Sequence, residues 1–327
     1  MTQPSRSQSR QAQAESWLGN SVTLEPASSD GSFRSYYRAH LDARTWILMD
    51  APPAQEDCRA FVEMSQRLID AGVQAPRVIE QNLEDGFLLL DDFGGTDYLS
   101  ALDSRTAPAL YADAERALHK IQQAKAHGLA AYDEQLLRRE IQLFPQWLLE
   151  THLEQNLDDT FYRHWSALGD TLVDNALSQP QVLVHRDYHS RNLMRTENNN
   201  PGVLDFQDAV KGPVTYDPVS LYRDCYVQWP EDDTENWLQT FRIQHPNSTI
   251  AGIDASLWQH WCDLMGVQRH LKAAGIFCRL WHRDGKQGFM ADIPRTLSYI
   301  TRVADRHPSL NWLAGLINEI SPRLRNP

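Results

Sequence analysis

The chain has 327 residues, of which 42% are hydrophobic and 9% aromatic, so a sizeable core is available and global disorder is excluded. Its formal net charge of −12 argues against non-specific binding to nucleic acid or membranes, although it permits a local basic pocket. This length exceeds what one small core usually holds, and we expect two lobes or one domain with a large appendage.

Residues 1–18 are polar and lack the apolar segment of a secretory signal, so we expect a frayed tail there. No apolar run reaches the ~18 residues of a membrane span, and the sequence predicts a cytoplasmic protein that binds no membrane. The four cysteines show no C-x-x-C pair, which favours structural thiols over a disulfide framework or a zinc site: Cys58, Cys225, Cys262 and Cys278.

Residues 19–93 have the pattern of a small β lobe. The apolar residues Phe61, Met64 and Leu68 recur at helical spacing, which predicts one helix over residues 57–71. Three short strands are expected before this helix and two after it, over residues 21–26, 33–41, 45–50, 77–81 and 86–91.

Residues 94–327 are expected to form a larger, mostly helical lobe. Amphipathic helices are predicted between residues 98 and 174, with a break or kink at Pro145. Short strands follow over residues 181–206, joined by the tight turn ENNNP, and helices return after Tyr216. The fold class is therefore α+β, with an antiparallel N-terminal lobe.

A dense polar motif lies within the region of short strands. His185, Arg186, Asp187 and Asn192 give H-R-D-x-x-x-x-N, and Asp205 opens the following D-F-Q. This spacing resembles the catalytic loop and metal-binding aspartate of kinases. Asp187 can orient a hydroxyl and accept its proton, while Asn192 and Asp205 offer the oxygen ligands that suit Mg²⁺. Any one of them alone would more often cap a turn, but the full set indicates phosphoryl transfer.

The same loop holds further polar residues besides Asp187 and Asn192. We expect His185 and Arg186 to brace the loop by hydrogen bonds. The sequence leaves open whether His189 and Arg191 meet the substrate or solvent.

The turn SSDGSFR between the first two strands offers backbone N–H groups that can cradle phosphate, although an ordinary hairpin turn has the same composition. The segment LLDD would form the hinge between the lobes, where its backbone could contact an adenine edge. The nucleotide-binding candidates are Gly31, Ser32, Phe33, Arg34, Leu90 and Asp91.

These segments together resemble the aminoglycoside phosphotransferase/choline kinase-like family over nearly the whole chain after the tail. The resemblance is carried by SSDGSFRSYYR, LLLDDFGG, VLVHRDYHSRNLM, GVLDFQDA and GPVTYDPVSL. It implies a two-lobed protein-kinase-like fold, ATP and Mg²⁺ as cofactors, and phosphoryl transfer to an alcohol group.

Within that family, DFQDAVKGPVTYDPVSLYRDCY and QRHLKAAGIF are most similar to the anomeric sugar kinases of bacterial cell-wall recycling. Those enzymes phosphorylate N-acetylmuramate and N-acetylglucosamine at C1 with ATP. The resemblance implies an amino sugar and a nucleotide as binding partners, with no obligate protein partner. Other acceptors of the same fold remain as alternatives, namely an aminoglycoside, choline or homoserine.

One departure from the family concerns its usual lysine on the third strand, because Met49 stands near that place and the first lysine is Lys120. Arg34 is our candidate for the replacement, ahead of Arg38 and Arg44. Glu63 then lacks its usual lysine partner, and we expect it on a solvated helix face. The missing lysine also keeps a nucleotide-binding pseudokinase as an alternative.

A second departure concerns the acceptor, since only eleven residues separate Asp205 from Asp217 and no A-P-E motif follows. This spacing therefore argues against a protein substrate. Asp217 matches a family position that braces the catalytic loop, although it could simply cap a turn.

Cations for a sugar acid could come from Arg223 and from residues 269–283, where Arg269, Lys272, Arg279 and Arg283 recur near one helical face. A solvated basic face is the alternative for this stripe. We expect Arg223 and Arg269 near the acceptor. The acceptor candidates are His189, Arg191, Asp217, Arg223 and Arg269.

Overall fold

The computed structural model describes residues 5–29 and 33–324. The chain divides into two compact units. The first unit comprises Met1–Lys120 and Asn192–Asp208, and the second comprises Ile121–Arg191 and Ala209–Pro327. The lobe boundary that we expect after residue 93 stays a prediction.

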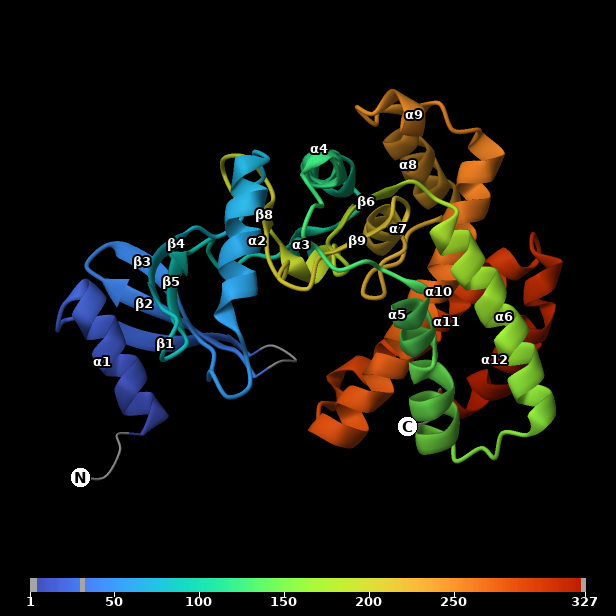
Figure 1. Ribbon diagram of the computed structural model, residues 1–327, viewed down its shortest axis with the longest axis horizontal. Helices are drawn as coiled ribbons and strands as arrows, with labels where there is room; N and C mark the ends of the chain where they lie inside the picture. The colour runs from blue at the N-terminus through green and yellow to red at the C-terminus, as the bar shows by residue number, and fades with distance from the viewer. Residues whose placement is uncertain (1–4, 30–32, 325–327) are drawn as a thin grey trace. The chain divides into compact units, whose positions relative to one another are not determined.

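The first unit is built on a five-stranded antiparallel sheet with the strand order β1-β2-β3-β5-β4 (Figure 1). The three strands before the predicted helix and the two after it are all present. They are β1 (Thr23–Ser29), β2 (Ser35–Leu41), β3 (Arg44–Asp50), β4 (Val78–Asn82) and β5 (Phe87–Asp91).

The expected frayed tail is instead a helix, α1 (Arg6–Leu18), which begins with a capping box. Ala14 is buried in a small core shared with the sheet. Arg6 and Arg10 form ion pairs of 2.6 and 2.9 Å with the buried Asp50 at the end of β3. The polar composition of this segment did not predict the helix, because ion pairs with a residue far along the chain hold it against the sheet.

The helix α2 (Cys58–Asp70) covers the opposite face of the sheet from α1 (Figure 1). Its Phe61 ring lies 4.8 Å from the ring of Phe206, between centroids. The unit is completed by α3 (Tyr98–Ala101), most of α4 (Ala107–Gln123), and the antiparallel pair β7 (Leu193–Met194) and β8 (Gly202–Val203), which the predicted turn ENNNP joins.

The second unit is mostly helical, as predicted. Pro145 does end the regular helix, because α5 stops at Ile141 and a π-helical segment begins at Phe144. Two short strands, β6 (Gln181–Val184) and β9 (Val210–Pro213), form an antiparallel pair. The helices are α5 (Glu134–Ile141), η1 (Phe144–His152), α6 (Asp159–Leu177), η2 (Ser190–Asn192, whose last residue belongs to the first unit), α7 (Tyr216–Tyr222), α8 (Glu231–Ile243), α9 (Ser248–Ala251), α10 (Ala255–Asp284), η3 (Gln287–Asp292), α11 (Ile293–Ala304), η4 (Pro308–Leu310) and α12 (Asn311–Leu324).

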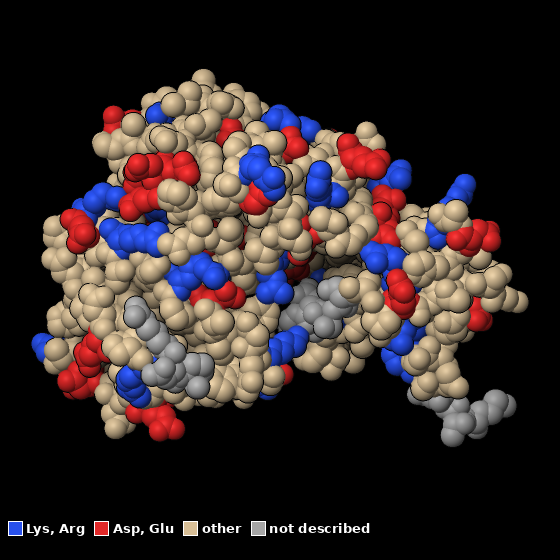
Figure 2. Space-filling view, turned by 180° about the vertical axis from the view of Figure 1, so that it is seen from behind, with Lys and Arg blue, Asp and Glu red and all other residues tan. Residues whose placement is uncertain are grey.

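Acidic and basic side chains are interspersed over the face that Figure 2 shows. In the described part of the chain, no helix is long and apolar enough to cross a membrane. All four cysteines are buried, and none of them forms a disulfide.

Candidate active site

The loop that carries Asp187 follows β6 in the second unit. Hydrogen bonds to the Asp217 side chain hold the start of this loop. The two carboxylate oxygens of Asp217 accept hydrogen bonds from the backbone N–H groups of His185 and Arg186, at 2.7 and 3.0 Å. Burial raises the pKa of Asp217 to about 7, although both N–H donors favour the ionised form. The contacts of Asp217 are therefore those of a brace.

A buried ionic network lies against the same loop. Arg186 has a left-handed backbone (φ 77°), and its guanidinium forms an ion pair with the buried Glu140 of α5. Lys272 of α10 lies 3.3 Å from the Glu140 carboxylate and donates a hydrogen bond of 3.1 Å to the hydroxyl of Tyr216. One carboxylate therefore holds a buried lysine and a half-buried arginine beside the catalytic loop.

This arrangement fulfils the expected bracing role of Arg186, and His185 contributes as well, since its Nδ1 accepts the N–H of Asp187 at 3.3 Å. The sequence did not reveal Glu140. Its only signal was a charged residue on the apolar face of an amphipathic helix.

Asp187 is half-buried, and the charges around it decide its ionisation. Burial opposes the charged form, but the positive charges of Lys272 and Arg186 help to lower the pKa of Asp187 to about 2. Asp187 is therefore a carboxylate at neutral pH, able to accept a hydrogen bond from a hydroxyl group.

The two candidate metal ligands lie together in the first unit. The Asn192 amide donates a hydrogen bond of 3.3 Å to Asp205, and the Leu204 N–H donates one of 2.9 Å to the Asn192 carbonyl. Asp205 has a left-handed backbone (φ 62°), and its other oxygen accepts from Gln207 at 2.8 Å. One amide and one carboxylate oxygen form a hard donor set that fits Mg²⁺.

The nucleotide candidates are only partly described, because Gly31 and Ser32 lie outside the described residues. Phe33 is 62% exposed, whereas Arg34 is buried with its Nε 3.7 Å from the Glu56 carboxylate. Leu90 is buried in the sheet, and Asp91 pairs with Arg77 at 2.8 Å.

The position of the missing third-strand lysine is filled by Met49, which is fully buried. Arg38, the second candidate to replace this lysine, forms a bidentate ion pair with Asp92, at 2.6 and 3.1 Å. Glu63 is exposed and pairs with Arg67 one helical turn later, as expected for a solvated face.

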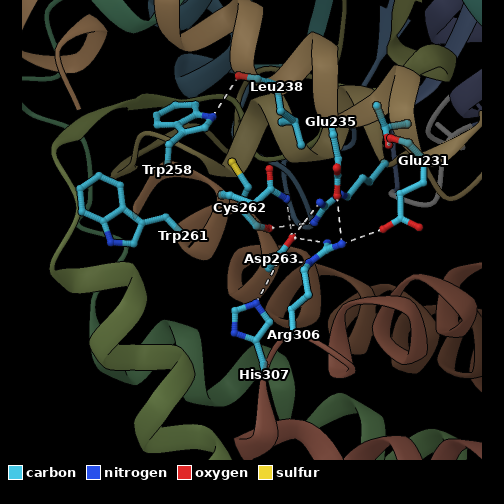
Figure 3. Close-up of polar contacts among 12 residues, drawn as sticks. Glu231, Glu235, Leu238, Trp258, Trp261, Cys262, Asp263, Arg306 and His307 are labelled. Atoms are coloured by element: carbon cyan, nitrogen blue, oxygen red, sulfur yellow. Dashed lines mark hydrogen bonds and ion pairs between the residues drawn. The ribbon is translucent and has the colours of Figure 1, made fainter. Parts of the chain in front are cut away.

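The acceptor candidates separate into two groups. Arg223 is buried in an ion pair of 2.8 Å with Asp263. Figure 3 shows that Asp263 also binds Arg306 and His307, at 3.1 and 2.9 Å. Asp263 is thus the centre of a structural network, and Arg223 belongs to it.

The other group surrounds the end of the catalytic loop. His189 is buried and its ring lies 5.3 Å from that of Tyr226, whereas Arg191 is exposed. Arg269 is buried and donates a hydrogen bond of 3.3 Å to the Cys225 thiol. The basic stripe is not one solvated face, because Arg269 and Lys272 point inward while Arg283 is exposed and pairs with Asp284.

Comparison with known proteins identifies the family that these motifs suggest. A model described as a phosphotransferase enzyme family matches residues 23–247. The chain belongs to this phosphotransferase family. The likeness includes the catalytic loop, the Asp205 segment and Asp217, so these site residues come from the region that defines the family.

Three relatives extend the likeness over nearly the whole chain, and each is named N-acetylmuramate/N-acetylglucosamine kinase. The protein from Pseudomonas putida is 46% identical, covering 93% of this chain and 90% of the relative. That from Pseudomonas aeruginosa is 48% identical, with coverage of 90% and 87%. The Neisseria meningitidis protein is 38% identical, with coverage of 95% and 96%.

Solved structures confirm the predicted kinase-like α+β fold. A thermostable mutant of aminoglycoside phosphotransferase APH(4)-Ia has a TM-score of 0.60 at 17% identity, covering 89% of this chain and 99% of that one. The ethanolamine kinase of Plasmodium vivax has a TM-score of 0.64 at 10% identity, with coverage of 86% and 82%. At such identities the likeness concerns the fold alone.

Proposed function

We propose that this phosphotransferase uses ATP to phosphorylate the anomeric hydroxyl of N-acetylmuramate and N-acetylglucosamine. The observation that carries the proposal is 38–48% identity to three kinases named for these sugars, over 87–96% of their lengths. The choice of C1 rests on the likeness of residues 205–226 and 268–277 to anomeric sugar kinases.

Asp187 is proposed as the group that orients the acceptor hydroxyl and takes its proton. A carboxylate with a pKa of about 2 is ionised at every physiological pH, but it is a weak base. An anomeric hydroxyl is more acidic than an ordinary alcohol and requires less base strength. Orientation of the hydroxyl is therefore the main contribution expected from Asp187.

Asn192 and Asp205 are proposed to hold Mg²⁺, with their side-chain oxygens as ligands. Bound Mg²⁺ neutralises charge on the phosphates of ATP during phosphoryl transfer. Arg34 and the backbone of the adjoining turn are proposed for the nucleotide, and Arg34 would take the place of the family lysine.

His189, Arg191 and Arg269 remain as acceptor candidates, whereas the contacts of Asp217 and Arg223 support structural roles. A cationic neighbourhood favours an acidic or neutral sugar over an aminoglycoside, which is a polycation.

The test is ³¹P NMR of the purified protein with Mg-ATP and each sugar in turn. A new signal split by the anomeric proton is the expected result and would establish a sugar 1-phosphate. A sugar phosphate without that splitting would move the reaction to another hydroxyl. ADP without any sugar phosphate would mean another acceptor, and no consumption of ATP would favour the pseudokinase.

A further inference from the structure

Arg191 is held in an unusual setting at the end of the catalytic loop. Its guanidinium carbon lies 4.9 Å from the ring centroid of Tyr226 and 5.0 Å from that of Phe289. Two rings therefore lie within cation–π distance of an exposed guanidinium. Among the described residues, no carboxylate forms an ion pair with Arg191. Its positive charge is thus available to a ligand.

The rings beneath Arg191 are firmly supported. Phe289 stacks on the buried Phe277, with 5.6 Å between centroids and 15° between planes, and the backbone N–H of Tyr226 donates to Asp224 at 2.9 Å. Tyr226 and Phe289 are themselves only half-buried. They offer apolar faces against which the face of a sugar ring can pack.

A second observation at this place points to a ligand. His189 is 8% exposed and its ring lies against Tyr226, yet its Nδ1 has no hydrogen-bond partner among the described residues. A buried ring nitrogen without a partner is unfavourable unless a ligand or water satisfies it. The backbone N–H of His189 donates to the Asp187 carbonyl at 3.1 Å, which ties this surface to the proposed catalytic residue.

Of the arginines in this neighbourhood, Arg191 is the one whose charge can serve a bound anion. Asp292 is the nearby acid, and its carboxylate is paired with Arg295 at 2.7 Å. Arg295 also donates to the Cys225 carbonyl at 2.9 Å, and Arg269 donates to the Cys225 thiol. These two arginines are engaged within the protein. Arg191 interacts electrostatically with Asp292 and contacts two rings, but among the described residues it forms no ion pair of its own.

We propose that Arg191, held over Tyr226 and Phe289, binds the carboxylate of N-acetylmuramate and so determines the preference between the two sugars. This inference rests on the proposed function. N-acetylmuramate differs from N-acetylglucosamine by a lactyl ether on C3, two ring carbons from C1, which ends in a carboxylate. A planar guanidinium matches that group in a bidentate geometry, and the neutral sugar has no counterpart for it.

The test compares kcat/KM for the two sugars in Arg191→Gln, Arg191→Lys and the unmodified protein, with the KM for ATP measured in parallel. Arg191→Gln is expected to lower the ratio of the N-acetylmuramate value to the N-acetylglucosamine value about tenfold or more, because a charge-assisted pair is lost. Arg191→Lys should restore part of the ratio, since it keeps the charge without the planar fork. Arg163→Gln, an exposed arginine on α6, is the matched control and should keep the ratio.

Three outcomes would overturn the inference. An unchanged ratio in Arg191→Gln would show that Arg191 does not recognise the carboxylate. Equal losses on both sugars with a raised KM for ATP would assign Arg191 to the nucleotide instead. Absence of turnover of either sugar by the unmodified protein would overturn the proposed function and this inference with it, whereas turnover of both sugars with an unchanged ratio overturns the inference alone.

Discussion

Asp224 accepts two hydrogen bonds from Ser190, one from the backbone N–H at 2.9 Å and one from the hydroxyl at 2.6 Å. Asp224 is fully buried, and its other oxygen accepts the N–H of Tyr226. One carboxylate therefore ties the catalytic loop to the aromatic surface beside it.

This relationship predicts unequal effects of two alanine substitutions. Asp224→Ala leaves several buried donors without a partner and should lower the free energy of unfolding by about 2 to 4 kcal/mol. Ser190→Ala removes one hydroxyl bond and should lower it by about 1 kcal/mol. Urea denaturation measures both changes, and kcat should fall further in Asp224→Ala. Equal, small changes in the free energy of unfolding would contradict a linking role of Asp224.

Asp187→Asn tests the proposed catalytic role with a side chain of nearly the same shape. An amide cannot accept the proton, so kcat should fall by about 10²- to 10⁴-fold. Nucleotide affinity, measured by calorimetry, should change little because the assigned metal ligands are unaltered. Asp174→Asn, at an exposed position of α6, is the control. Loss of nucleotide binding in Asp187→Asn would count against this role.

Local patterns in the sequence predicted the elements that depend on local order. The five strands and α2 follow from apolar periodicity, and the spacing of Asn192 and Asp205 across a tight turn predicted that they lie together. The resemblance to a family predicted that Asp217 braces the loop. Asp217 accepts two hydrogen bonds from the loop backbone, and its role stays a prediction.

The parts that escaped prediction depend on partners far apart in the chain. Lys272 was assigned to a stripe, but a carboxylate on another helix, Glu140, makes it a buried partner of the catalytic loop. The buried ion pair of Arg223 with Asp263 also escaped prediction, while the expectation that Arg223 lies near the acceptor stays untested. No pattern in a single sequence reveals such pairings. Helical periodicity predicts which face of a helix is buried, but not which residues of other elements pack against that face.

The raised pKa of Asp217 predicts a pH dependence of stability. Its folded pKa of about 7 exceeds the usual value of 3.8, so the folded state binds the proton more tightly. The stability from this group is complete below pH ~4 and is lost as pH rises through ~7, with a slope of at most about 1.4 kcal/mol per pH unit. Asp217→Asn should flatten this part of the profile, measured by urea denaturation from pH 5 to 8. An identical slope in the variant would mean that Asp217 is ionised throughout.

The anchor of α1 predicts a further stability effect. Asp50→Ala leaves two arginines without the carboxylate that they share and should lower the free energy of unfolding by about 2 to 4 kcal/mol. Asp57→Ala removes a cap and an exposed pair with Arg59, and should cost about 1 kcal/mol. Urea denaturation measures the free energy of unfolding of both variants. Equal losses would mean that the ion pairs of α1 contribute little to stability.

Two glycines within helices of the second unit predict opposite responses to the same substitution. A Cβ on Gly275 of α10 would lie 2.4 Å from the Leu143 carbonyl carbon and 2.5 Å from its oxygen, both backbone atoms that cannot move cheaply. Gly275→Ala should therefore lower the free energy of unfolding by about 1 to 3 kcal/mol, despite the higher helix propensity of alanine. A Cβ on Gly315 of α12 meets nothing within 4 Å, so Gly315→Ala should raise it by about 0.5 to 1 kcal/mol. Urea denaturation measures the free energy of unfolding of the two variants. If both substitutions raised it, α10 would not pack closely against Leu143.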